Sequence, residues 1–150
     1  MSADRDSHRT AGEMLDLIKR EVDRLGELIG APERSLPTYG RSEDMARPHI
    51  EVAGSRLSYV VVERGKEWER RTTDDLDELL YWTFSSVVAE MSAKFAATQP
   101  VQGKEFRHPM FKKELELMGK LSAVWRSRLI SELGSLLRDA GLSEQDLAVN

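Results

Sequence analysis

The chain has 150 residues, of which 40% are hydrophobic and 32% charged, a composition typical of one soluble globular domain. Its net charge of −4 argues against a nucleic-acid binder, because phosphate contacts need clustered Lys and Arg. The absence of cysteine excludes a disulfide scaffold and thiolate metal sites, and no apolar run is long enough for a membrane span. With no apolar leader-like stretch after Met1, we expect a cytoplasmic protein with no nucleic-acid or membrane partner.

The first part of the chain predicts a tail followed by a helix. Residues 1–11 are small, polar and charged, which predicts a disordered tail, with residues 12–150 forming a single domain. From Ala11 to Ile29 the apolar residues recur at helical spacing, and Gly30 ends the pattern.

Three short strands are predicted next, over residues 49–53, 57–63 and 66–71. They are separated by Gly54-Ser55 and Arg64-Gly65, which we interpret as two-residue turns.

Two-residue turns fix the register of this antiparallel meander. They place Val52 opposite Leu57, Ile50 opposite Tyr59, and Val61 opposite Trp68. The apolar side chains then share one face, and the other face carries alternating charges and is wet. We therefore expect Trp68 in the core, where its replacement by alanine would cost about 3–5 kcal/mol.

Helical patterns fill the rest of the chain. Thr73 is the predicted N-cap of a long helix that ends near Ala97, and a third helix follows Pro109. Ser122 is placed to cap a fourth helix that runs to Gly141, and a last turn begins at Ser143. The predicted fold class is α+β: an N-terminal helix, a three-stranded antiparallel meander, then three helices packed on its apolar face.

Catalytic motifs are missing from the sequence. It contains no GxSxG elbow, no phosphate-binding glycine loop and no histidine pair at metal-ligand spacing. His49 and Glu51 lie on the same face of a predicted strand and form at most half of a metal site. A small metal-dependent hydrolase using His49 and nearby carboxylates is therefore the enzymatic alternative, while we predict no enzyme, no cofactor and no metal.

Acidic side chains crowd the meander and the start of the long helix, interleaved with Arg and Lys. Basic neighbours keep carboxylates ionised, which favours a solvated or protein-binding surface over acid–base catalysis. The candidate partner-contacting residues are Glu51, Glu63, Glu67, Glu69, Asp74 and Asp75, with Tyr39, Tyr81 and Trp82 as aromatic anchors. Tyr81 and Trp82 also fit a second buried flank of their helix, so both roles stay open.

Several segments together resemble the immunity protein 63 family of bacterial polymorphic toxin systems. They are PTYG at 37–40, RPHIEV at 47–52, YVVVERG at 59–65, ERRTTDDLDELLYWTF at 69–84, KEFRH at 104–108 and the 121–125 segment. The resemblance covers about residues 36–128, with the segments in the same order and at similar spacing.

The resemblance implies a cytoplasmic protein that binds and neutralises a cognate toxin domain, often a nuclease, and it carries no catalytic residues. Inhibition by plugging the toxin's active site and inhibition by blocking its substrate surface both remain open. So do a non-toxin adaptor role and the oligomeric state.

Overall fold

The computed structural model describes residues 10–42, 46–100 and 106–148. The chain forms two compact units, Met1–Thr83 and Phe84–Asn150, and the boundary between them falls inside one helix. Residues 1–9 of the predicted tail lie outside the described residues, and the single domain over 12–150 stays a prediction.

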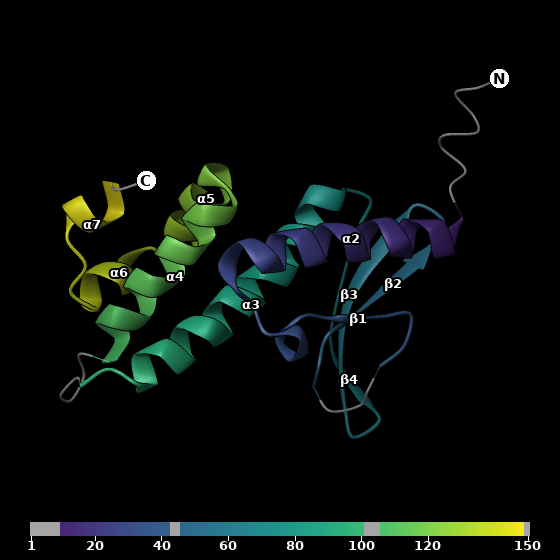
Figure 1. The fold of residues 1–150 in the computed structure, drawn as a ribbon, viewed down its shortest axis with the longest axis horizontal. Coiled ribbons are helices and arrows are strands. Elements are labelled where there is room, and N and C mark those ends of the chain that lie inside the picture. Colours follow the sequence, from purple (N-terminus) through teal and green to yellow (C-terminus); the bar gives the residue numbers. More distant parts are fainter. Residues whose placement is uncertain (1–9, 43–45, 101–105, 149–150) are drawn as a thin grey trace. The chain divides into compact units, whose positions relative to one another are not determined.

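The first helix, α2, spans Ala11–Ile29, as predicted. Thr10 caps it by accepting a hydrogen bond from the Glu13 backbone N–H at 3.1 Å. Its apolar stripe is buried, and the helix lies against strand β2 of the first unit (Figure 1). A short 3-10 turn, η1, follows at Glu33–Ser35.

The sheet has four strands in the order β1-β2-β3-β4 (Figure 1). Their bounds are β1 Thr38–Tyr39, β2 His49–Ala53, β3 Arg56–Glu63 and β4 Lys66–Thr73. The predicted three-strand count is therefore wrong by one, because the two-residue β1 pairs in parallel with β2. A strand this short has no periodicity that a sequence could show.

The first hairpin has the predicted register, with Ile50 opposite Tyr59 and Val52 opposite Leu57. The second turn, at Arg64 and Gly65, has φ values of 55° and 73°. A two-residue turn with positive φ at both central residues matches the twist of the two strands that it joins. Glycine adopts positive φ without steric cost.

The predicted placement of Trp68 is wrong. Val61 lies opposite Glu69, and Val62 lies opposite Glu67, so Trp68 is an extra residue in β4 at a bulge. Its side chain keeps 63% of its surface exposed. The bulge displaces the alternation by one residue, which removes Trp68 from the core face.

The predicted wet face is also partly wrong. Val60 is fully buried there, and His49 and Ser58 are buried on the same face. Ser58 and Thr72 share a hydrogen bond across β3 and β4 at 2.9 Å, which satisfies both hydroxyls.

Helix α3 spans Leu76–Ala97, and its C-terminal end matches the prediction. Its cap is Asp75 rather than Thr73, because Asp75 Oδ1 accepts from the Asp77 N–H at 2.9 Å. Thr73 still pairs with Leu57 in the sheet, and its hydroxyl accepts from the Asp75 N–H.

The second unit contains the later part of α3 and four further helices. These are α4 Arg107–Leu121, α5 Ala123–Leu133, α6 Ser135–Asp139 and α7 Glu144–Ala148. Ser122 caps α5 by accepting from the Trp125 N–H at 3.1 Å, as predicted. The predicted continuous helix up to Gly141 is wrong, because Gly134 has φ 54° and separates α5 from α6.

In this unit Trp125 is buried and stacks on Phe84 with ring centroids 6.4 Å apart. Packing of the C-terminal helices on the sheet stays a prediction. The α+β class itself is confirmed.

Candidate protein-binding surface

One face of the sheet carries four connected side chains, His49, Glu51, Glu67 and Arg70, which we call the polar network. The Arg70 guanidinium donates to Glu51 Oε1 at 3.0 Å and to Glu67 Oε1 at 2.8 Å. Arg70 pairs with Val60 of β3, which in turn pairs with His49 of β2. Because paired residues point to the same face, the sheet register brings these side chains together.

His49 is the buried member of the polar network, with 3% of its surface exposed. Its Nε2 lies 2.7 Å from Glu51 Oε2, and its buried Nδ1 has no hydrogen-bond partner among the described residues. His49 and Glu51, predicted as at most half of a metal site, therefore contact each other. The described part of the chain contains no group of three or more His, Asp or Glu residues that could hold a metal ion.

Both carboxylates of the polar network are held in the ionised form. Hydrogen bonds from Arg70, with a smaller contribution from His49, lower the pKa of Glu51. Arg70 likewise lowers the pKa of Glu67. A general acid needs the opposite shift, so these groups are suited to ionic contacts rather than proton transfer.

A second charged group involves two other predicted contact residues, Glu69 and Trp82. Arg71 Nε lies 2.7 Å from Glu69 Oε2, and the Arg71 guanidinium lies 5.8 Å from the centre of the Trp82 ring. Trp82 is half-buried, which is compatible with either role, and its role as a partner anchor stays a prediction. Arg71 connects the acidic and the aromatic candidate.

The other predicted acidic residues lie at the ends of elements. Glu63 is exposed where β3 ends, and Asp74 is exposed between β4 and α3. Asp75 is exposed too, but its carboxylate caps α3 and therefore already has a structural role.

The two tyrosines predicted as anchors point inward. Tyr81 is buried in the first unit with 2% of its surface exposed, which is its alternative role as a core residue. The Tyr39 hydroxyl is buried and lacks a hydrogen-bond partner among the described residues, and burial raises its pKa. Neither hydroxyl is presented at the surface.

Trp68 is the surface residue that sequence reasoning missed. Its ring is exposed, and Lys66 Nζ lies 4.9 Å from the ring centre. Its one sequence signal is its isolation, since it is the only large apolar side chain between Val62 and Leu76. Exposed tryptophans are favoured as anchors in protein interfaces.

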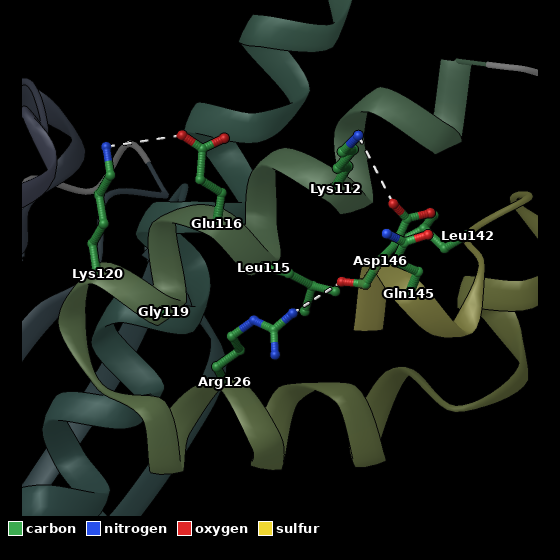
Figure 2. Close-up of a pocket in the computed structure, with 9 residues that line it drawn as sticks. All are labelled: Lys112, Leu115, Glu116, Gly119, Lys120, Arg126, Leu142, Gln145 and Asp146. Carbon is green, nitrogen blue, oxygen red and sulfur yellow. Dashed lines mark hydrogen bonds and ion pairs between the residues drawn. The ribbon is translucent and has the colours of Figure 1, made fainter. Parts of the chain in front are cut away.

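The second unit has a pocket of about 560 Å³ between α4, α5 and α7 (Figure 2). Arg126 lies in it and donates to the backbone carbonyls of Asp146 and Leu147, both at 3.0 Å. These bonds tie α7 to α5, and a side chain at Gly119 would press on Arg126 at 3.1 Å. The buried guanidinium is thus occupied in holding the fold together.

The fold and this surface define a small α+β protein with an exposed tryptophan beside ion-paired charges on its sheet. Among the described helices none is both long and apolar enough to cross a membrane.

The model of the family called Immunity protein 63 matches residues 54–135, and the chain belongs to this family. The predicted family is therefore confirmed. No curated protein and no solved structure matches the chain significantly. The matched region contains β3, β4, α3, α4 and α5.

Proposed function

We propose that this chain is a cytoplasmic immunity protein that neutralises a cognate polymorphic toxin domain by binding it stoichiometrically, without turnover of its own. The observation that carries the proposal is the family match, which covers both β3 and β4. Immunity of this kind requires a surface for another protein, and β4 supplies an exposed aromatic residue there.

The proposed contact surface follows β4 and includes both faces of the sheet beside it, because the register places Glu67 on one face and Glu69 on the other. Its members are Glu51, Glu63, Glu67, Glu69, Trp68, Asp74, Asp75 and Trp82. The carboxylates of the polar network and of Glu69 are already paired with arginines, so a partner that covers them leaves no lone charge buried. Ion pairs arranged in this way favour specificity and fast association.

Protection of toxin-expressing cells tests the proposal. Trp68→Ala should abolish or strongly reduce protection, because central aromatic anchors dominate binding energy. Val124→Ala is the matched control, since Val124 is an apolar side chain with 75% exposure in the other unit. Its protection should equal that of the unaltered protein.

A charge change tests the ionic part of the surface. If the toxin presents a basic surface here, Glu67→Lys should weaken binding, and more so at low salt, because it replaces an attractive charge at the proposed interface by a repulsive one. Glu90→Lys is its control: the two glutamates are each 44% exposed and each paired with a basic side chain. If the unaltered, folded chain gave no protection against any toxin domain encoded in the neighbouring genes, the non-toxin adaptor role would replace this proposal.

A further inference from the structure

The outer edge of β4 has a row of backbone groups that no other strand among the described residues pairs with. β4 is the last strand of the sheet (Figure 1). Residues 69–73 of β4 are in regular register with residues 57–61 of β3. The bulge is confined to the step between Val61 and Val62.

Two hydrogen bonds elsewhere in the sheet identify which β4 residues face this edge. The Ile50 carbonyl accepts from the Gly40 N–H at 2.7 Å, and the Val62 carbonyl accepts from the Ala46 N–H at 3.0 Å. Both carbonyls therefore point away from their cross-strand partners Tyr59 and Glu67. In antiparallel pairs, residues that face the partner strand alternate with residues that face away.

By this alternation, the N–H and C=O groups of Tyr59 point toward β4, and those of Val60 point toward β2. Arg71, which pairs with Tyr59, then bonds to β3. Its neighbours Arg70 and Thr72 direct their N–H and C=O groups to the outer edge.

We infer that this edge accepts an extended strand of the toxin domain, so that the immunity protein binds by adding a fifth strand to its sheet. The inference rests on the function proposed above. Arg70 and Thr72 present two N–H and two C=O groups at the spacing of alternate residues, roughly 7 Å, which an extended chain complements. Trp68, 63% exposed, lies directly beside this stretch and provides the side-chain anchor that backbone pairing needs for specificity.

A second copy of the chain fits the same edge poorly. An antiparallel copy centred on Arg70 places this side chain against its own equivalent, and a copy centred on Arg71 does the same. Like charges directly opposite each other in a sheet are destabilising. Charged side chains on an edge strand are a usual device against self-pairing.

Amide exchange measured by NMR, in the free protein and in its complex with a toxin domain against which it protects cells, tests the edge directly. The Arg70 and Thr72 amides should exchange quickly in the free protein and at least about 100-fold more slowly in the complex. The Arg71 and Thr73 amides, which bond to β3, should be slow in both states and serve as internal controls.

A pair of variants tests the same edge by affinity. Thr72→Pro removes an edge-facing N–H that β3 does not use, and proline is tolerated at such positions. Thr72→Val keeps the N–H, and both variants lose the hydroxyl contact with Ser58. The proline variant should bind the toxin domain at least about tenfold more weakly than the valine variant, since an acceptor of the toxin strand loses its donor.

The outcomes separate this inference from the proposed function. A complex that protects cells while the Arg70 and Thr72 amides still exchange quickly would overturn strand addition and leave the immunity role in place. A free protein that is dimeric, with these amides already slow, would overturn it in favour of self-pairing. Absence of any complex and any protection would reject both. If Thr72→Pro does not fold, the exchange measurement still decides.

Discussion

Glu114 on α4 makes stability depend on pH in a way that a single substitution should remove. Its side chain lies on the buried face of α4 beside Phe111 and Met118, with 6% of its surface exposed. Burial disfavours the charged carboxylate and raises the pKa of Glu114 to about 7. The unfolded chain ionises near the ordinary value of about 4.3.

The direction of the pH dependence follows from the difference between the folded and unfolded pKa values of Glu114. Between about pH 4.3 and pH 7 the folded protein binds more protons than the unfolded chain, so its free energy of unfolding falls as pH rises. The stability that Glu114 contributes is complete below the unfolded pKa and is lost as pH rises through the folded pKa. The full difference corresponds to about 4 kcal/mol, a large share of the roughly 5–15 kcal/mol typical of a domain.

Glu114→Gln keeps the shape and stays neutral, so its stability relative to the unaltered protein should rise by about 2–3 kcal/mol between about pH 4.5 and pH 8. Urea titrations at several pH values, followed by circular dichroism, measure this difference. Glu116→Gln is the control, because Glu116 lies on the same helix with its side chain 52% exposed. A parallel pH dependence in Glu114→Gln and the unaltered protein would refute the idea that burial perturbs this carboxyl.

Three further predictions concern other side chains. Trp68→Ala should change the free energy of unfolding by about 1 kcal/mol or less, whereas Trp125→Ala, which removes a buried ring stacked on Phe84, should cost about 3–5 kcal/mol in the same titrations. Arg126→Ala should leave two α7 carbonyls without their donors and cost about 2–3 kcal/mol, with faster amide exchange across α7; unchanged exchange there would show that α7 is held by other contacts. Arg70→Ala should alter stability by only about 1 kcal/mol or less, because its ion pairs are partly exposed, and a larger loss in thermal melts would indicate that the polar network supports the fold.

The parts of the fold that depend on local signals could be predicted from the sequence. The bounds of α2 follow from its apolar spacing and Gly30, and the Ser122 cap follows from its residue type and position. The shift of the α3 cap to Asp75 depends on how far β4 pairs with β3, which involves a partner 16 residues away at Leu57. No local pattern contains that information.

The bulge shows the same limit inside the sheet. Alternation predicts a register only if each residue of one strand faces one residue of the other, and Trp68 breaks that condition. A register without the bulge places Trp68, the aromatic residue of β4, in the predicted core. It also conceals the role of Arg70, which becomes visible only when carboxylates from β2 and β4 lie on one face.

The tryptophan and the polar network are expected to contribute differently to binding. A tryptophan can bury about 150–250 Å², so the exposed part of Trp68 offers on the order of 100–150 Å² to a partner. At about 25 cal/mol per Å², covering it contributes about 3 kcal/mol before the cost of ordering the interface is subtracted, so roughly 100-fold in affinity is its upper limit.

The carboxylates of the polar network contribute less binding free energy than the tryptophan. Arg70 already donates hydrogen bonds to them, and a partner must compete with those bonds. The fixed positions of these carboxylates instead select the partner and its orientation. Loss of protection in Trp68→Ala with little effect of Glu67→Lys would therefore place the binding energy in the tryptophan. The reverse pattern would place it in the charges, and the surface would then work mainly by electrostatic attraction.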